Sequence, residues 1–122
     1  MIIGHGIDLV EIERISNIYA KYKEKFVCKY FINDQLKKIN SNLLANNFAI
    51  KEAFSKSIAL GFKSPCYPKN IVVSRDNLGK PVISLKNKLE SYLNETFGKY
   101  VIHVSLTDTK LYSIASVIIE QN

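Results

Sequence analysis

The segment from Leu43 to Leu60 constrains the fold of this chain most, because its apolar residues recur at helical spacing. The stripe that predicts a buried helix face consists of Ile50, Ala53, Phe54, Ser57 and Ile58. Gly61 follows this segment and is well placed to end the helix. Glu52 and Lys56 lie at the edge of the stripe. The sequence therefore predicts a long central helix with charged groups at the rim of its buried face.

The other elements alternate between strands and helices, with no repeat and no linker between them. In chain order the sequence predicts a strand at 2–10, a helix from about 11 or 13 to 22, a short helix capped by Asn33 and ending at Ile39, a β-hairpin at 70–85, a helix capped by Ser84 and closed by Gly98, and two strands at 100–106 and 111–120. Because helices and antiparallel hairpins segregate along the chain, we expect an α+β fold in one domain over residues 1–122.

The composition favours a small globular domain. The chain has 122 residues, of which 47% are hydrophobic, and a domain of this size buries only about two-thirds of its unfolded surface. Oligomerisation would therefore add useful burial. No apolar run approaches the roughly 18 residues that span a bilayer, and no basic leader follows Met1, so we expect neither a membrane segment nor a signal peptide. Cys28 and Cys66 are expected to be free, buried thiols in a reducing cytoplasm.

The net charge of +6 predicts an anionic partner. That partner can be a nucleic acid, a phosphorylated small molecule or an acidic protein, and part of the excess can equally be a solvated lysine-rich face. Lysines concentrate between residues 21 and 38, where only Glu24 and Asp34 oppose them. Charge alone does not distinguish these partners.

Asp8 is the first candidate for chemistry. It lies in the predicted first strand, on the same face as Gly4 and Gly6, although aspartate is disfavoured inside strands. Glycines in a strand indicate close approach by a ligand or by another backbone. A buried carboxylate needs a cation or several donors. Asp8 is therefore either a ligand for a hard metal ion or a cap for the following helix.

Glu52 and Lys56 are the second candidates. They lie four residues apart on the predicted helix, which suits a surface ion pair worth about 0.2–0.5 kcal/mol. Alternatively, Glu52 and Asp8 together hold Mg²⁺, which typically takes one or two carboxylates together with phosphate oxygens and waters. Lys51 and Lys56 would then bind the phosphates of a substrate.

His103 is a weaker candidate. It shares a strand face with Ser105 and can either donate to a phosphate or be a hydrogen-bonded structural residue. The sequence has no phosphate-binding loop, no HExxH motif and no Ser/His/Asp order. The residues alone therefore predict a metal-and-phosphate site without identifying the acceptor.

Taken together, four segments resemble the successive motifs of one family. They are "GIDLVEI" at 6–12, "FAIKEAFSKS" at 48–57, "DNLGKPVI" at 76–83 and "HVSLTDTKLYSIASVII" at 103–119. They look like the motifs of holo-[acyl-carrier-protein] synthase, the short bacterial type of 4′-phosphopantetheinyl transferase. The resemblance runs from Ile2 to about Glu120, with the order and spacing of the motifs intact.

The resemblance implies an enzyme that moves phosphopantetheine from coenzyme A to a serine of apo-acyl carrier protein in fatty acid biosynthesis, releasing 3′,5′-ADP. It implies that Asp8 and Glu52 hold Mg²⁺, for which Mn²⁺ can substitute, and that Glu52 is the general base. Lys56 would stabilise or protonate the leaving phosphate. His103, and more weakly Lys51, would contact phosphates of coenzyme A.

The family also implies an assembly. Members of this length are homotrimers in which each active site lies at a protomer interface, which agrees with the small core expected here. The turn that borders the nucleotide would be formed by Gly79, Lys80 and Pro81.

The lysine-rich charge has a use under the same resemblance, because acyl carrier proteins are strongly acidic. Arg14 on the first predicted helix is the residue expected at the docking surface for the carrier protein, with Lys21 and Lys25 beside it. Attraction of this kind weakens as salt rises.

The chain departs from the family at two positions. Many members have an arginine where this chain has Asn47, and many have a histidine where it has Asp108. These differences concern nucleotide binding and leave Asp8, Glu52 and Lys56 in place.

Two rival functions remain from the sequence. A basic nucleic-acid-binding module would use the lysines of 21–38 with interleaved aromatic residues, but no recognised signature is present and Asp8 would have no role. A non-catalytic interaction domain of the same fold is disfavoured by the intact Asp8, Glu52 and Lys56. We therefore expect no nucleic acid and no membrane among the partners.

Overall fold

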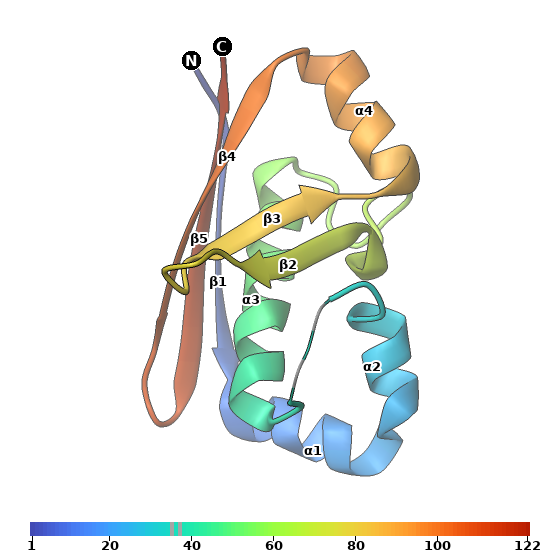
Figure 1. Ribbon diagram of the computed structural model, residues 1–122, viewed down its shortest axis with the longest axis vertical. Helices are drawn as coiled ribbons and strands as arrows, with labels where there is room; N and C mark the ends of the chain where they lie inside the picture. The colour runs from blue at the N-terminus through green and yellow to red at the C-terminus, as the bar shows by residue number, and fades with distance from the viewer. Residues whose placement is uncertain (35, 37) are drawn as a thin grey trace.

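The computed structural model describes residues 1–34, 36 and 38–122 (Figure 1). The elements in chain order are β1 (Ile2–Glu11), α1 (Ile12–Tyr22), α2 (Glu24–Tyr30), α3 (Ser41–Ser57), a 3₁₀ turn (Pro68–Asn70), β2 (Ile71–Arg75), β3 (Pro81–Leu85), α4 (Asn87–Phe97), β4 (Tyr100–Asp108) and β5 (Tyr112–Gln121). The predicted α+β class is confirmed.

The strands form two antiparallel sheets. One has the order β1-β5-β4, and the other is the hairpin of β2 and β3. Figure 1 shows the three-stranded sheet edge-on, with the four helices all on the same side of it. None of the helices in the described residues covers the opposite face of this sheet, where Ile7 and Leu9 are exposed.

The long helix α3 packs directly on β1. A Cβ atom at Gly6 would overlap the carbonyl oxygen of Ala53, and one at Gly4 would overlap that of Ser57. Only glycine therefore permits this contact between strand and helix. Of the two explanations for the glycine face, close approach of another backbone is the one that the structure bears out.

The helix boundaries differ from the prediction in physical detail. Asn40 caps α3, since its side chain accepts the amide of Leu43 at 2.8 Å, and the helix ends at Ser57, before the predicted Leu60. Ser84 lies inside β3 and Lys86 occupies the capping position of α4, so the predicted cap at Ser84 is wrong.

The helix predicted from Asn33 to Ile39 is not seen in the described part of that segment, and residues 35 and 37 lie outside it. Asn33 instead donates to the carbonyl of Lys69 at 2.7 Å. A helix that the sequence did not predict, α2, precedes this segment. Its Phe26 packs with Tyr30 and Phe48 in an aromatic cluster that joins α2 to α3.

The predicted hairpin is confirmed. Oδ1 of Asp76 accepts the amides of Leu78 and Lys80, each at 2.9 Å, and Gly79 takes a positive φ of 82° in the turn. Both cysteines are free, but Cys28 is exposed, so only Cys66 fits the expected buried thiol. Among the helices of the described chain, none has the length and apolarity to cross a membrane.

Candidate active site

The structure brings Asp8, Glu52 and Lys56 together at the edge of the contact between β1 and α3. Nζ of Lys56 donates to Oδ1 of Asp8 at 2.9 Å and to the carbonyl oxygen of Ile7 at 3.1 Å. Glu52 lies one helical turn before Lys56 on α3 and is half-buried. Residues that are far apart in the sequence therefore form one charged cluster.

The local sequence explains this cluster. Alternation along β1 places Asp8 on the same face as Gly6, which is the face that α3 covers. Gly6 lets the helix backbone touch the strand, so that the side chain two residues later meets the flank of α3. The neighbouring position on β5 is Ala115, which is fully buried and leaves room for the helix.

Glu52 is electrostatically coupled to its surroundings. Burial raises the pKa of its carboxyl group above the ordinary value, the charge of Asp8 raises it further, and the charges of Lys56 and Arg14 lower it. Two carboxylates and two cations therefore share one half-buried rim. Perturbed carboxylates of this kind are typical of functional sites.

The structure supports neither structural alternative for Asp8 and Glu52. Glu11, and not Asp8, occupies the position before α1, and no side chain there makes a capping bond, so the helix-cap alternative for Asp8 is wrong. Within the described residues Lys56 pairs with Asp8, and Glu52 forms no ion pair with it. The surface-pair alternative for Glu52 is therefore not borne out either.

The donor set suits a hard cation that is completed by other ligands. Asp8 and Glu52 supply two carboxylates, and the described residues contain no group of three or more His, Cys, Asp or Glu that could hold a metal ion. An all-protein cage for Zn²⁺ or Ca²⁺ is thus not formed by those residues. Mg²⁺ ordinarily binds through one or two carboxylates with substrate phosphates and waters, so the residues present fit it.

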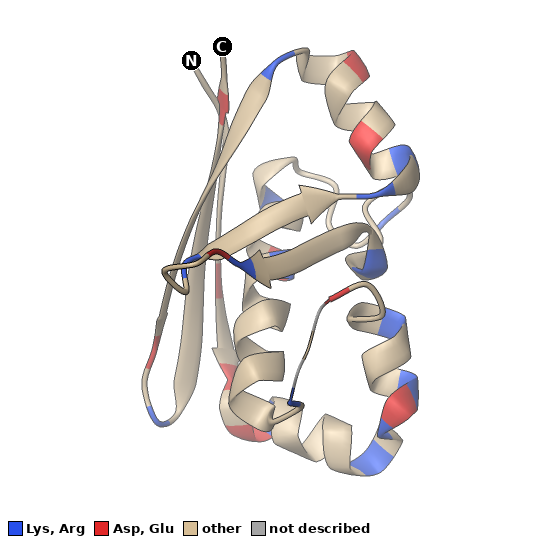
Figure 2. Ribbon diagram, viewed as in Figure 1, with Lys and Arg blue, Asp and Glu red and all other residues tan. Residues whose placement is uncertain are grey.

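Arg14 lies next to this rim and also lines a cavity. The cavity has a volume of about 270 Å³ and lies between α1, α2 and α3. The cavity combines basic side chains with an aromatic lining, and its members include Arg14, Lys25, Lys29, Tyr22, Phe26 and Phe48. Basic positions follow α2 and the junction of α1 with α2 (Figure 2). Lys21 does not line the cavity and instead lies over the ring of Tyr22.

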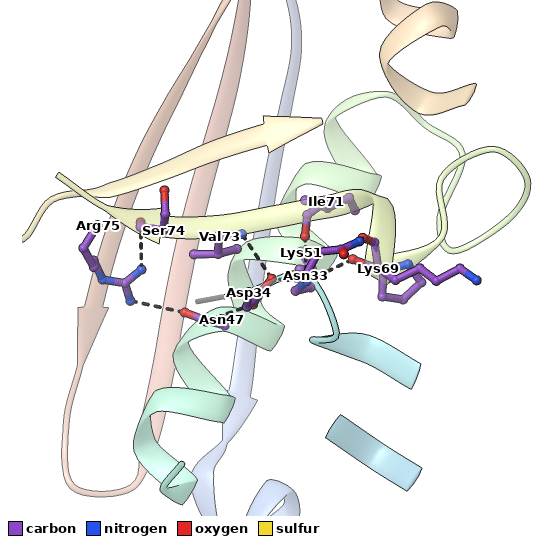
Figure 3. Close-up of polar contacts among 10 residues, drawn as sticks. Asn33, Asp34, Asn47, Lys51, Lys69, Ile71, Val73, Ser74 and Arg75 are labelled. Carbon is purple, nitrogen blue, oxygen red and sulfur yellow. Dashed lines mark hydrogen bonds and ion pairs between the residues drawn. The ribbon is translucent and has the colours of Figure 1, made fainter. Parts of the chain in front are cut away.

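Lys51 is the clear correction to the predicted site (Figure 3). Its ammonium group is fully buried and donates to Oδ1 of Asp34 at 2.9 Å and to the carbonyl oxygens of Pro68 and Ile71 at 3.0 and 2.6 Å. All three donors of the ammonium group are therefore used inside the protein. The structure contradicts a phosphate-binding role for Lys51.

His103 lies on the other face of the sheet from Asp8. It pairs with Ile118, and the same position of β5 pairs with His5, whereas Asp8 pairs with Ala115 on the helix-covered face. Nε2 of His103 lies 3.1 Å from Oε1 of Glu120. A single chain does not bring His103 to Asp8.

The remaining predicted positions are also apart from the cluster. Gly79 and Lys80 are exposed in the β2–β3 turn, next to Pro81 at the start of β3, and within the described residues no hydrogen bond joins this turn to Asp8, Glu52 or Lys56.

The two departures from the family are both engaged in polar contacts. Asn47 is buried, donates to Oδ2 of Asp34 at 3.1 Å and accepts from Nη2 of Arg75 at 3.3 Å. Asp108 accepts from Nδ2 of Asn46 at 3.0 Å. Sequence reasoning missed Asp34 and Arg75, which have no motif and meet α3 only through the tertiary fold.

Comparison with known proteins assigns the family. Residues 4–113 match the 4′-phosphopantetheinyl transferase superfamily. The chain is 39% identical over 131 residues to a holo-[acyl-carrier-protein] synthase of Wigglesworthia glossinidia brevipalpis, with 99% of this chain and 94% of that protein covered.

Solved structures agree. A holo-[acyl-carrier-protein] synthase of Neisseria meningitidis superposes with a TM-score of 0.88 at 30% identity, covering 99% of this chain and 100% of that one. The Helicobacter pylori synthase in complex with coenzyme A gives a TM-score of 0.82 at 28% identity, covering 95% and 99%.

The chain therefore belongs to the 4′-phosphopantetheinyl transferase superfamily. Within that superfamily it is similar over its whole length to the holo-[acyl-carrier-protein] synthases. The resemblance that the four sequence motifs indicated is confirmed.

Proposed function

We propose that this protein transfers the 4′-phosphopantetheine group of coenzyme A to a serine of apo-acyl carrier protein, giving the holo carrier and 3′,5′-ADP for fatty acid biosynthesis in the cytoplasm. The observation that carries the proposal is the cluster of Asp8, Glu52 and Lys56 at the rim of α3, in a chain similar to these synthases along its length. The coenzyme A complex of the H. pylori relative supports the choice of donor.

Asp8 and Glu52 are the residues that would hold Mg²⁺, or Mn²⁺ in its place. When bound, such an ion neutralises charge on the diphosphate of coenzyme A and orients it. Glu52 is also the residue that would accept the serine proton, because it lies at the same rim as Asp8 and Lys56 and is half-buried. In the metal-free protein, burial and the charge of Asp8 raise the pKa of this carboxyl group.

The proposed transfer step exchanges one bond between phosphorus and oxygen for another. The serine Oγ forms a bond to the phosphorus that carries pantetheine, and its proton passes to Glu52. The bond between that phosphorus and the bridging oxygen breaks, and 3′,5′-ADP leaves with the electron pair. Lys56 is half-exposed and would donate to the departing phosphate, where its charge would stabilise the transition state.

A homotrimer is part of the proposal. The face of the three-stranded sheet that the described helices leave uncovered carries exposed Ile7, Leu9 and Val101 together with His103. Burying this face between copies would supply the apolar burial that a chain of this size lacks. Because β1 is an edge strand of this sheet, a copy packed across that edge would bring its His103 and its turn at 79–81 toward Asp8.

The carrier protein would dock at the cavity beside Arg14. Arg14, Lys25 and Lys29 surround aromatic side chains there, which suits an acidic helix that inserts one apolar side chain. Lys21 is exposed nearby on α1 and would add to the attraction without lining the cavity.

The test is an intact-mass measurement of the carrier. Apo-acyl carrier protein is incubated with the protein, coenzyme A and Mg²⁺, with EDTA in a parallel sample. We expect the carrier to gain one phosphopantetheine, and the gain to be absent with EDTA. A variant of an exposed acidic residue on α4, Glu90→Ala, serves as the matched control and should behave as wild type. A folded oligomer that leaves a competent carrier unmodified would overturn the proposal.

A further inference from the structure

A buried polar network lies on the flank of α3 that faces β2, and we call it the Asp34 network. Its buried side chains, shown in Figure 3, are those of Asp34, Asn47 and Lys51, and the exposed Arg75 donates to Asn47 at the outer end of the network. Oδ1 of Asp34 accepts from Lys51 at 2.9 Å and from the amide of Val73 at 3.3 Å, and Oδ2 accepts from Asn47 at 3.1 Å. One carboxylate therefore receives three donors from two different elements.

The network contacts α3 at two positions along the helix axis. Asn47 and Lys51 lie four residues apart, which is about one helical turn, and both contact Asp34. Lys51 also donates to the carbonyls of Pro68 and Ile71, which precede and begin β2. These contacts fix both the rotation of α3 about its axis and its position along that axis.

Glu52 is the next residue after Lys51, turned by about 100° around the helix. That turn takes it away from the network and toward Asp8, whose charge it senses. Lys56 follows one turn later and contacts Asp8 directly. Any rotation or sliding of α3 that the network prevents would therefore move both side chains relative to Asp8.

Stability alone does not account for a buried ion pair at this place. Replacing such a pair by apolar side chains of similar volume is often neutral or stabilising, because the charges must first be taken out of water. Apolar contacts would, however, permit several helix positions, whereas three hydrogen bonds from one ammonium group permit very few. Among the described residues no buried polar side-chain atom lacks a partner, so the network is complete.

We propose that the Asp34–Lys51 pair is a positioning device for transfer, which sets the register of α3 and thereby the placement of Glu52 and Lys56 beside Asp8. This inference rests on the proposed function. Catalytic groups must be held within about 0.5 Å of their productive positions, and a misplacement of about 1 Å can lower a rate about 100-fold. A network anchored in a second sheet supplies that restraint.

The test replaces both partners at once. In the double variant Asp34→Leu/Lys51→Met no charge is left unpaired, so the fold should persist. Its Tm should be lowered only by the loss of hydrogen-bond partners at Asn47, at the amide of Val73 and at the carbonyls of Pro68 and Ile71. We expect kcat for carrier modification to fall about 10- to 100-fold, with KM for coenzyme A and for the carrier changed by less than about threefold because neither partner contacts the substrates. Assays are run well below the lowest Tm.

The matched control is Leu93→Ala in α4, which opens a cavity in the core and lies on a helix that contributes no residue to the Asp34 network. It should lower Tm and leave kcat unchanged at the same temperature. A double variant with wild-type kcat, or a kcat loss that Leu93→Ala reproduces, would overturn the positioning role.

A second readout does not depend on the reaction. Amide hydrogen exchange over residues 52–57 should be faster in the double variant, while exchange in β5 should be unchanged, and equal protection of residues 52–57 in both proteins would contradict the proposal. If the double variant does not fold, Asn47→Ala removes one arm only and should give a smaller fall in kcat by the same tests. Failure of wild type to modify the carrier would instead contradict the proposed function.

Discussion

Two lysines on α3, five residues apart, make the same contact in opposite surroundings. Lys51 and Lys56 each place the ammonium nitrogen 2.9 Å from Oδ1 of an aspartate. The side chains of the Lys51–Asp34 pair are both 0% exposed, whereas those of Lys56 and Asp8 are 52% and 14% exposed. The distance is identical, and only the environment differs.

The environment decides what each pair can do. All three donors of the Lys51 ammonium group bind protein acceptors, and the side chain has no access to solvent. Lys51 can therefore stabilise the structure but cannot contact a ligand. Lys56 keeps its ammonium group at a solvent-exposed rim, although Asp8 is only 14% exposed. A pair with one partner open to solvent is worth no more than about 1 kcal/mol. The open pair therefore suits a group that must contact substrate phosphates, and the closed pair suits a group that positions the helix.

The largest effect should come from removing a carboxylate of the cluster formed by Asp8, Glu52 and Lys56. Asp8→Ala and Glu52→Ala should each lower transfer by about 1,000-fold or more, because each removes a group that acts on the developing charge. Both side chains lie at the rim and outside the apolar core, so circular dichroism and oligomeric state should be unchanged. Near-normal turnover of either variant in Mg²⁺, measured by intact mass, would remove the proposed metal site.

A smaller effect should follow from separating β1 from α3, which carry the two halves of this cluster. The new Cβ in Gly6→Ala would overlap the carbonyl of Ala53, so α3 must move away from β1. We expect a loss of about 1–3 kcal/mol in the free energy of unfolding, together with a fall in kcat at temperatures where the variant is fully folded. Urea unfolding and carrier modification measure the two effects.

An exposed residue outside the glycine contact supplies the reference for this variant. Glu13→Ala on α1 changes an exposed residue and should alter neither quantity. Unchanged unfolding of Gly6→Ala would show that the strand and the helix are not in contact as described.

Reversing the charge of Arg14 should raise KM for one substrate much more than for the other. Arg14→Glu should raise KM for the carrier about tenfold while KM for coenzyme A changes little, since Arg14 lines the cavity proposed for carrier docking. The difference from wild type should shrink as ionic strength increases. Equal rises in both KM values would argue against a docking role.

The smallest effect concerns the pH dependence of folding in the metal-free protein. Burial and the charge of Asp8 raise the pKa of Glu52 above its ordinary value of 4.5, while Lys56 and Arg14 oppose the rise. The folded protein therefore binds this proton more tightly than the unfolded chain does. The resulting stability is present below pH 4.5 and is lost as pH rises through the raised pKa.

Glu52→Gln has no such proton and should lack this loss. Urea unfolding of both proteins in EDTA across the acid range measures the difference. Parallel pH profiles for the two proteins would show that the pKa of Glu52 is not raised.

The elements with short-range signals could be predicted from the sequence. The apolar stripe of α3 and the turn residues at 76–79 act within a few positions, and both elements were confirmed. The cluster of Asp8, Glu52 and Lys56 could also be predicted from the sequence. Strand alternation determines the face on which Asp8 lies, and helical spacing places Glu52 and Lys56 on one edge of α3.

The different roles of Lys51 and Lys56 could not be predicted in the same way. The partner of Lys51 is Asp34, 17 residues earlier, in a segment expected to be helical but found without helix where it is described. Lys51 and Glu52 are consecutive residues on the helix, about 100° apart. Helical periodicity alone therefore does not show whether the fold buries Lys51 or Lys56. Burial of a charge is decided by the tertiary contacts of β2 and of the segment after α2, and no local pattern records them.

One pair of variants tests the contrast between the two lysines most directly. The free energy of unfolding and kcat for carrier modification are measured for Lys56→Met and Lys51→Met. We predict that Lys56→Met changes unfolding by less than about 1 kcal/mol and loses most of its kcat, whereas Lys51→Met loses about 3–5 kcal/mol because the charge of Asp34 is left buried and unpaired. Equal losses of stability, or a fully active Lys56→Met, would contradict the assignment of one pair to structure and the other to chemistry.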